Sequence, residues 1–432
     1  MFQALLTLCR ERFAQLPDYR KPSPNLQYTI QDAALSAFAV FLMQSPSFLA
    51  HQRDMQRRKG RNNANSLFGV HRIPSDNQIR NILDPIAPAQ LSELFWQIYG
   101  QLDTAQLLKA HTGFAGNLLC ALDGVQYFSS QAISCENCTR FQHDETVTYG
   151  HSLIAPVLVA PDAPSVFNLE PEFIQPQDGH DKQDCELAAA KRWLKRHAQC
   201  LPAERTTILG DDLLCHQPFC EAVRAAQCNF ILVCLPESHT TLYTEIALLA
   251  QAGLLDTLSQ QVWNGRHYET RTYRYTNHVP LRSGADGLLV NWCEVTVTHS
   301  QTGEQLYYNS FVTNFALRAD TVAEVVRSGR ARWKTENENH NTLKNRGYHL
   351  EHNFGHGRQF LSMLLVSLNL LAFLLHTVLL LTDHTAQQVR TALGSYVTFW
   401  GDLRTLTRYL YFQSWAQLFD FMLTQLELAS SP

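Results

Sequence analysis

Acidic residues stand at three places in the chain where carboxylates could hold a divalent cation. Asp123 and Asp211 each come at the end of a short apolar run, and residues 332–347 carry two glutamates, Glu336 and Glu338. These acids are far apart in the sequence, so only the fold can bring them together. Carboxylates that converge repel one another and are costly to bury, and Mg²⁺ relieves this conflict because it prefers hard oxygen ligands. Two such ions can activate an attacking oxygen and stabilise a leaving oxygen in phosphoryl transfer.

The two glutamates have different neighbours on the helix that the third segment predicts. Arg332, Glu336, His340 and Lys344 are spaced by four, which places them along one helical face, whereas Glu338 lies elsewhere. A carboxylate flanked by cations suits a metal ligand whose neighbours contact DNA phosphates. Ordinary salt bridges on a solvated helix have the same spacing, so the pattern alone leaves both interpretations open.

The segments around the first two acids alternate between strands and helices. Apolar β-forming runs predict strands, and amphipathic runs predict helices between them; the strands are 117–123, 146–160, 206–212 and 229–235, and the helices are 185–200 and 217–228. This alternation favours an α/β sheet with parallel strands. Ligand chemistry in such sheets lies at the carboxyl ends of the strands, which is where we expect Asp123 and Asp211. For Asp211 and its neighbour Asp212, a helix N-cap or turn is the structural alternative.

The rest of the chain divides into three further regions. Residues 1 to about 110 are mostly helical by pattern, residues 237–315 are rich in alternating β-formers, and helices return from about 320. A basic run at 53–63 predicts either a solvated turn or a contact with DNA phosphates. The charged stretch 178–186 predicts a capped loop near the edge of the active site.

Composition limits the class of protein. The chain has 432 residues, of which 45% are hydrophobic and 17% charged, and this is a globular composition. Its net charge of −4 gives no support to DNA binding, so local groups of Arg and Lys must supply it. Eleven cysteines and an N-terminal segment without signal-peptide features predict mostly free thiols in a reducing cytosol.

One apolar segment is long enough to cross a bilayer. Residues 360–381 contain no formally charged side chain. However, Ser362, Asn369, His376 and Asp383 recur every seven residues and would form a polar stripe on one helical face. We therefore expect a long core helix and no membrane span.

Three motifs together resemble a known family. They are LDGVQYF at Asp123, ILGDDLLCHQPF at Asp211, and RWKTENENHNTLKNRGYHLEHNFGHG at 332–357. In this order they resemble the DDE transposases of bacterial insertion sequences, and the resemblance covers about residues 115–385. The catalytic core of that family is RNase H-like, with its third acid on a helix after the last core strand and often a β-rich insertion before that helix.

The resemblance distinguishes the two glutamates. The family pattern around the third acid is Tyr-x2-Arg-x3-Glu-x6-Lys, and Arg332 with Glu336 fits its centre. Gly329 stands where the tyrosine is expected, and Lys344 lies eight residues after Glu336 instead of seven. The resemblance thus implies Glu336 as the third acid, with Glu338 as the alternative. For the second acid we prefer Asp211 to Asp212, because Asp211 is the first residue beyond the apolar strand.

The resemblance implies an α/β fold class, with an RNase H-like core interrupted by a β-rich insertion and helical regions at both ends. We expect a helical N-terminal domain at 1–112, which is a candidate for DNA-end binding, and the first part of the core at 113–236. The β-rich insertion follows at 237–318. The catalytic helix with the rest of the core is expected at 319–385, and a C-terminal helical region at 386–432.

The resemblance also implies a function and a catalytic site. Asp123, Asp211 and Glu336 would bind two Mg²⁺, with Mn²⁺ able to substitute, and the enzyme would cleave the ends of its element and join them to target DNA. The partners would be double-stranded DNA, as terminal inverted repeats and as target, and a second copy of the chain, in the bacterial cytoplasm at the nucleoid. A nuclease of the same fold without strand transfer and an inactive DNA-binding relic are the alternatives.

Three residues are expected to contact DNA. Arg332 and Lys344 flank the third acid, and Trp292 lies in the insertion together with Trp263. Relatives use an aromatic residue of the insertion to stack on a flipped base, and core packing is the alternative for both tryptophans.

A second metal site is predicted from cysteine spacing. Cys135 and Cys138 form a CxxC motif, and His143 and His151 follow it. Two cysteines and two histidines are a ligand set of structural Zn²⁺, whereas a turn with free thiols is the alternative. His352 and His356 are separate from this set: they could approach the catalytic metal site, and a role as structural histidines is the alternative.

Overall fold

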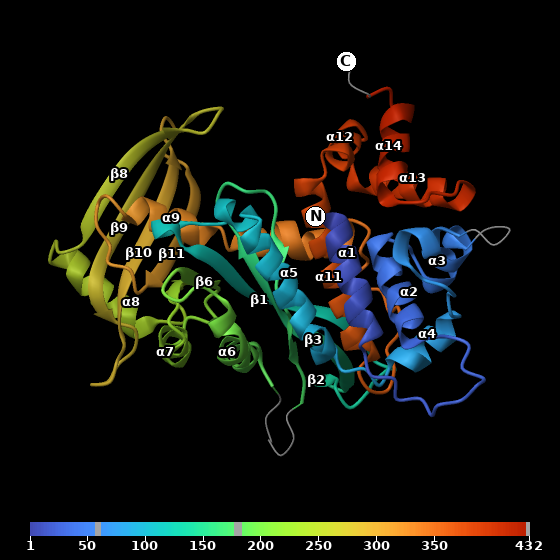
Figure 1. Cartoon of the computed structure of the whole chain (residues 1–432). Helices are drawn as coiled ribbons and strands as arrows, with labels where there is room; N and C mark the ends of the chain where they lie inside the picture. Colours follow the sequence, from blue (N-terminus) through green and yellow to red (C-terminus); the bar gives the residue numbers. More distant parts are fainter. Residues whose placement is uncertain (57–61, 177–183, 429–432) are drawn as a thin grey trace.

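A single sheet runs through the computed structural model, which describes residues 1–56, 62–176 and 184–428 (Figure 1). The strand order is β2-β3-β1-β6-β7-β11-β10-β9-β8, and two short strands, β4 and β5, pair with β3. The protein is therefore a mixed α/β structure, as predicted. Residues 57–61 of the predicted basic run at 53–63 and residues 178–183 of the charged loop at 178–186 lie outside the described residues.

The central strands form where the sequence has apolar runs. β1 (Leu118–Ser130) is antiparallel to β3 (Thr146–Val159) and parallel to β6 (Thr206–Gly210), which in turn is parallel to β7 (Asn229–Val233). The crossover helices α6 (Glu186–His197) and α7 (Gln217–Ala225) connect the parallel strands. β1 is longer than expected and continues well beyond Asp123, because this second half pairs with β3.

Three short strands complete this end of the sheet. β2 (Thr139–His143), β4 (Phe167–Asn168) and β5 (Glu172–Ile174) all pair antiparallel with β3.

The predicted β-rich insertion is present, but it extends the main sheet. α8 (Thr240–Gln251) leads into four antiparallel strands, β8 (Asp256–Trp263), β9 (Tyr268–Pro280), β10 (Leu289–His299) and β11 (Gln305–Thr313). β11 pairs with the core strand β7, with Phe311 opposite Val233. The insertion therefore continues the sheet of the core, and it forms the lobe at the left of Figure 1.

The segment with the third acid is not one regular helix. α9 (Val322–Arg330) ends in a turn, η6 (Thr335–His340) is a π-helix, and α10 (Asn341–Asn345) follows it. The regular spacing by four predicted an α-helix throughout, and this prediction is wrong over η6. π-Helical turns are rare and occur frequently at functional sites.

Helices of the two chain ends pack together at the right of Figure 1. The N-terminal set and the C-terminal set comprise α1 (Phe2–Ala14), α2 (Ile30–Leu42), α3 (Phe48–Met55), η1 (Ala64–Phe68), α4 (Asp76–Leu83), η2 (Pro88–Leu91), α5 (Ser92–Thr104), η3 (Leu107–Ala110) and η4 (Phe114–Gly116), then α11 (Leu361–Thr382), α12 (His384–Ala392), α13 (Tyr396–Tyr409) and α14 (Trp415–Gln425). The short helix η5 (Ala198–Cys200) follows α6. These elements agree with the helical ends expected from the sequence.

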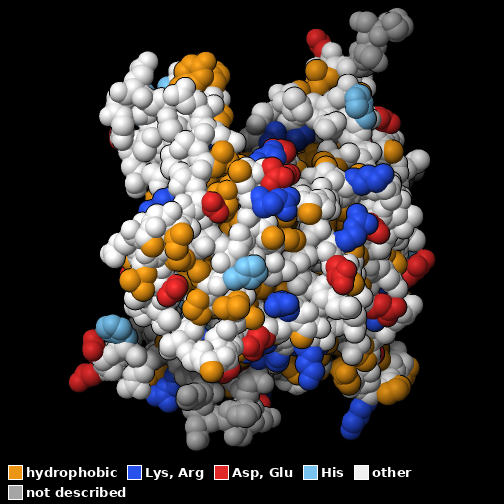
Figure 2. Space-filling view, turned by 90° about the vertical axis from the view of Figure 1, so that its left-hand side faces the viewer, with side chains coloured by type: hydrophobic (Ala, Val, Ile, Leu, Met, Phe, Trp, Pro, Cys, Tyr) orange, Lys and Arg blue, Asp and Glu red, His pale blue; other side chains and the backbone are white. Residues whose placement is uncertain are grey.

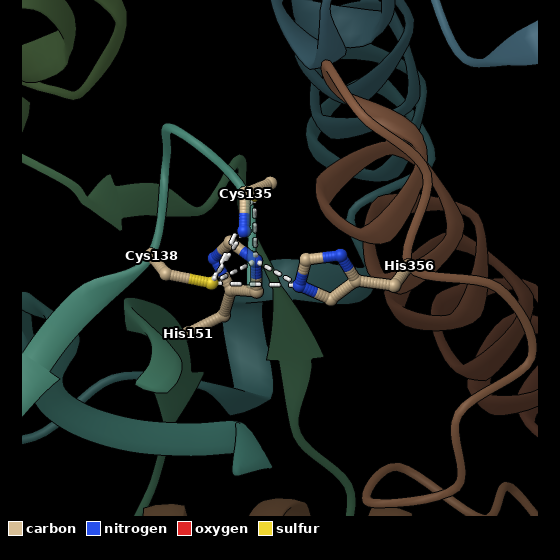
Figure 3. Close-up of side chains that lie close together, drawn as sticks. All are labelled: Cys135, Cys138, His151 and His356. Atoms are coloured by element: carbon tan, nitrogen blue, oxygen red, sulfur yellow. Dashed lines mark hydrogen bonds between the residues drawn. The ribbon is translucent and has the colours of Figure 1, made fainter. Parts of the chain in front are cut away.

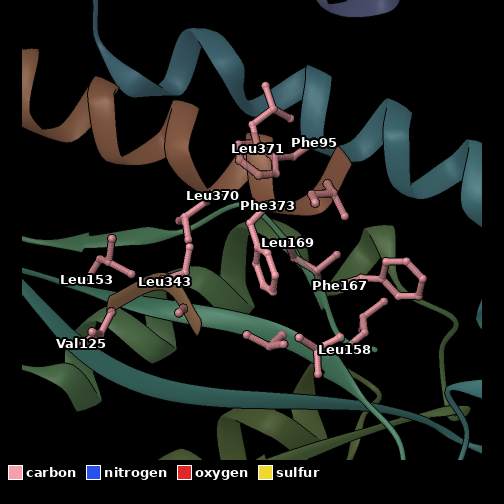
Figure 4. Close-up of a cluster of buried hydrophobic side chains, with 14 of the residues drawn as sticks. Phe95, Val125, Leu153, Leu158, Phe167, Leu169, Leu343, Leu370, Leu371 and Phe373 are labelled. Atoms are coloured by element: carbon pink, nitrogen blue, oxygen red, sulfur yellow. The ribbon is translucent and has the colours of Figure 1, made fainter. Parts of the chain in front are cut away.

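The long apolar helix α11 lies in the core. By length and composition it could span a membrane, but 89% of its most apolar window is buried within the protein. Its polar stripe bonds to the interior: Asn369 donates to the Tyr348 carbonyl at 2.9 Å, and His376 Nε2 lies 2.8 Å from the Leu42 carbonyl. Figure 4 shows Leu370, Leu371 and Phe373 of α11 among buried side chains of α5 and the sheet. The prediction of a core helix agrees with this packing.

Candidate active site and metal centre

Strand register brings Asp123 and Asp211 together. In the parallel β1–β6 pair, Ala121 lies opposite Leu209. Two positions further on, in the same register, are Asp123 in β1 and Asp211 directly after β6. Neighbouring strands lie about 4.8 Å apart, and residues in register on parallel strands project to the same face. The prediction that Asp123 ends its strand is therefore wrong. Asp123 lies within β1, level with the point where β6 ends.

Asp123 is a partly buried carboxylate with both cationic and anionic neighbours. Its side chain is 20% exposed, and Arg332 Nη1 lies 3.8 Å from Oδ1. Burial raises the pKa of Asp123 to about 6; Arg332 opposes this shift, and Asp211, Glu186 and Glu336 add to it. The four acids Asp123, Glu186, Asp211 and Glu336 are therefore electrostatic neighbours, and we call them the carboxylate cluster.

His340 is the second nitrogen donor beside this carboxylate. Its Nδ1 lies 3.7 Å from Asp123 Oδ2. Burial and the cations Lys344 and Arg332 lower the pKa of His340 to about 4, so its ring is neutral at pH 7. The charge that offsets Asp123 therefore comes from Arg332 and not from His340.

Sequence reasoning missed Glu186 as a member of the cluster. It is the first residue of α6, and burial together with Asp211 raises its pKa. Its carboxylate packs against the backbone of Gly124, where an added Cβ would come within 2.3 Å of it. The stretch 178–186 was expected near the active-site edge, but an acid in the first turn of a helix is common and did not distinguish Glu186.

The two glutamates of the third segment point to different surroundings. Glu336 is exposed, accepts a hydrogen bond from Trp333 Nε1 at 3.0 Å, and acts electrostatically on Asp123. The charge of Glu338 opposes the lowering of the Lys334 pKa that burial causes. Glu338 also lines a cavity of about 630 Å³ beside α9. The electrostatics thus associate Glu336, and not Glu338, with the carboxylate cluster.

The expected DNA-contacting residues have unequal access to solvent. Arg332 is partly exposed beside Asp123, and Lys344 forms an ion pair with Glu351 at 2.8 Å. Trp292 is fully buried and its indole N–H lies 3.4 Å from the Tyr243 hydroxyl, so its expected stacking on a base is wrong for this conformation. Trp263, at the end of β8, is 54% exposed.

Cationic side chains that the sequence analysis did not single out surround the 630 Å³ cavity. Arg271 of β9, Arg327 and Arg330 of α9, and Lys334 line it together with Trp333, which is 58% exposed. Viewed from the side of the insertion, Figure 2 shows basic and acidic side chains together at the base of a hollow at the upper edge of the molecule, and Glu324 and Glu338 also line the cavity. This arrangement places positive charge and an exposed aromatic ring next to the helix that carries Glu336.

A second site is a compact cysteine–histidine centre (Figure 3). It consists of Cys135 and Cys138 from the loop after β1, His151 from β3, and His356 from the segment before α11. The thiol of Cys138 lies 3.8 Å from the Cys135 sulfur, 3.4 Å from His151 Nε2 and 3.4 Å from His356 Nε2. The two histidine Nε2 atoms are 3.1 Å apart, and Cys135 Sγ lies 3.5 Å from His151 Nε2.

These separations are those of a metal-binding tetrahedron. Zn–S bonds of about 2.3 Å and Zn–N bonds of about 2.0–2.1 Å place tetrahedral ligands about 3.8 Å apart for two sulfurs, about 3.5 Å for sulfur and nitrogen, and about 3.3 Å for two nitrogens. The cluster is therefore compatible with a metal ion. His143, the predicted partner, has a side chain that is 94% exposed and lies outside the cluster, and His356 takes its place.

In the described part of the chain, only cysteine–histidine clusters bring three or more ligand atoms within 4.8 Å of one another. The oxygens of the carboxylate cluster are more widely spread.

Comparison with known proteins adds no relative. The chain matches no protein-family model, and no curated protein matches its sequence. Conclusions about function therefore depend on the site itself.

The raised pKa of Asp123 predicts a stability change in the metal-free protein. The folded state holds the proton of Asp123 more tightly than the unfolded state, where its pKa is 3.8, so stability falls as pH rises from about 4 to above 6. Asp123→Asn should therefore raise the free energy of unfolding at pH 8 by about 1–3 kcal/mol and have little effect at pH 3.5. Denaturant unfolding at both pH values measures this difference.

Asp420→Asn is the matched control, because Asp420 is exposed on α14. It should change stability by less than about 0.5 kcal/mol at either pH. Destabilisation by Asp123→Asn at pH 8 would contradict the assignment of Asp123 as an electrostatically strained carboxylate.

Proposed function

We propose that the protein is a DDE transposase that cleaves DNA ends and joins them to target DNA by two-metal phosphoryl transfer. The observation that carries the proposal is the parallel β1–β6 register, which brings Asp123 of β1 level with Asp211 directly after β6, with Glu336 acting on Asp123 from the π-helix η6. The antiparallel β1–β3 pair beside the parallel β1–β6–β7 set supports an RNase H-like core.

The electrostatics support divalent cations as the cofactors. Asp123 and Glu186 are both partly buried and have raised pKa values, and the nearby cation Arg332 does not restore the ordinary pKa of Asp123. Mg²⁺ bound by Asp123, Asp211 and Glu336 would stabilise their charged forms, and Mn²⁺ can replace it. Bound there, the ions would supply an activated water and stabilise the leaving oxygen of DNA.

The chain's own residues would prepare this site. Arg332 offsets part of the negative charge of Asp123, and the glycine at position 124 leaves space for the Glu186 carboxylate. The neutral ring of His340 can accept or donate a hydrogen bond beside Asp123 without adding charge. Trp333 holds the Glu336 carboxylate by a hydrogen bond.

The basic cavity supports double-stranded DNA as the partner. Arg271, Arg327, Arg330 and Lys334 lie beside the helix of Glu336, and phosphate contacts of this kind supply sequence-independent affinity. Grouping of these Arg and Lys side chains offers DNA a local set of cations, although the whole chain has a net charge of −4. Two copies of the chain, each on one inverted repeat, would pair the ends before joining, in the bacterial cytoplasm at the nucleoid.

We further propose that the cysteine–histidine centre binds structural Zn²⁺. Its four ligands occupy all tetrahedral positions, as in closed structural sites. The Cys138 thiol and the two histidines lower the pKa of Cys135, which favours the thiolate that binds metal. The ion would tie the loop after β1 to the segment before α11.

Zinc analysis tests this centre. His356→Ala should remove one equivalent of zinc, and at free zinc 1,000 times the dissociation constant this would lower the free energy of unfolding by about 4 kcal/mol. His143→Ala is the matched control and should retain the metal, because His143 is exposed. Metal content by elemental analysis and unfolding by denaturant measure both effects. Equal zinc in both variants would contradict the assigned ligand set.

The catalytic proposal is tested with labelled DNA that carries the sequences flanking the gene, incubated with the protein and Mg²⁺. Glu336→Gln should reduce cleavage at the repeat boundary at least about a hundredfold. Removing a residue that only hydrogen-bonds to a metal ligand already lowers activity by up to about a hundredfold, and removing the ligand itself should cost no less. Glu338→Gln should retain cleavage. The opposite result would move the third acid to Glu338.

The same assay distinguishes the alternatives. Cleavage with joined products in target DNA supports a transposase, and cleavage without joined products indicates a nuclease. Binding without cleavage in either Mg²⁺ or Mn²⁺ would indicate an inactive relic and overturn the proposed activity.

A further inference from the structure

A second cysteine–histidine cluster lies directly beside the loop that carries Asp211. Its members are Cys215, Cys234 and His239, whose ligand atoms all lie within 4.8 Å of one another. Cys215 and Cys234 are completely buried, and His239 is 5% exposed. Cys215 is in the loop after β6, Cys234 directly follows β7, and His239 precedes α8. Three metal-binding atoms from two separate loops thus meet at one buried point.

His239 faces a carboxylate as well as the two thiols. Among the described residues, its buried Nε2 makes no well-aligned hydrogen bond, and Asp212 Oδ1 lies 3.3 Å away, at ion-pair distance. That oxygen accepts the backbone N–H of Leu235 at 2.6 Å. A metal ion bound by the three ligand atoms would replace the contacts that they make with one another. The neighbouring Asp212 carboxylate would add negative charge beside such an ion.

We propose that Cys215, Cys234 and His239 bind a second Zn²⁺. Two thiolates and an imidazole are ligands that zinc prefers, whereas Mg²⁺ prefers oxygen. Cys215 and His239 also line a cavity of about 380 Å³, so water can reach the fourth position. The site therefore differs from the closed centre at Cys135, which has four protein ligands.

The position of the ion suggests its role. It would join the loop after β6 to the loop after β7, four residues from Asp211. The ion would fix the backbone that presents Asp211 to the carboxylate cluster. This positioning role rests on the proposed function, but binding of the ion does not.

Zinc stoichiometry of the full chain, purified under reducing conditions, tests the site without any activity measurement. Wild-type protein should hold two zinc ions per chain. Cys234→Ser and the double variant Cys135→Ser/Cys138→Ser should each hold one. Cys293→Ser is the matched control, because Cys293 is equally buried in β10 but outside both clusters, and it should hold two.

Equal zinc in wild type and Cys234→Ser would overturn the proposal. So would a Cys215–Cys234 disulfide in the protein as purified under reducing conditions, detected by counting free thiols after denaturation. If Cys234→Ser does not fold, X-ray absorption at the zinc edge of the double variant decides the question. Two sulfur ligands and one imidazole nitrogen are expected, and coordination by light atoms alone would contradict the site. Because none of these readouts uses DNA, failure of the zinc site and failure of the transposase proposal remain distinguishable.

Discussion

Electrostatic repulsion among four carboxylates at one edge of the parallel strands is the constraint on which the site depends. The β1–β6 register places Asp123 beside Asp211, and Glu186 and Glu336 approach from α6 and η6. Burial and mutual repulsion hold the pKa of Asp123 at about 6, although Arg332 lies 3.8 Å away. A fold selected only for stability would avoid such a cluster. Its presence is explained if cations complete it, which is the basis of the proposed two-metal chemistry.

Elements around the cluster are held by polar networks and by metal-binding groups. Arg192 of α6 donates to the buried carboxylates Glu172 and Asp184 at 2.6–2.9 Å, which fixes Asp184 two residues before Glu186. The cysteine–histidine centre ties the far end of β1 to the segment after α10 through His356. Near it, Asn137 donates to the Gln359 carbonyl at 2.6 Å. These contacts join segments distant in sequence, so they restrict the motion of the elements that carry the acids.

Local patterns were sufficient to predict part of this arrangement. Short apolar runs ending in acids identified β6, the start of β1, and the acids Asp123 and Asp211, because strand formation depends on neighbouring residues. Contacts between residues that are distant in the sequence could not be predicted from local patterns. His356 meets Cys138 only through the fold, and Trp292 is buried because β10 lies inside an extended sheet. The π-helix at Glu336 was missed because spacing by four fits an α-helix equally well.

Manganese binding tests the central claim most directly, since Mn²⁺ occupies Mg²⁺ sites and is visible by electron paramagnetic resonance. The full chain, without DNA and at pH 8, is titrated with Mn²⁺ beside Asp123→Asn and Asp420→Asn. The account predicts saturable binding in wild type and Asp420→Asn and its loss in Asp123→Asn. Equal binding by all three proteins would show that Asp123 is no metal ligand and would contradict the proposed catalytic centre.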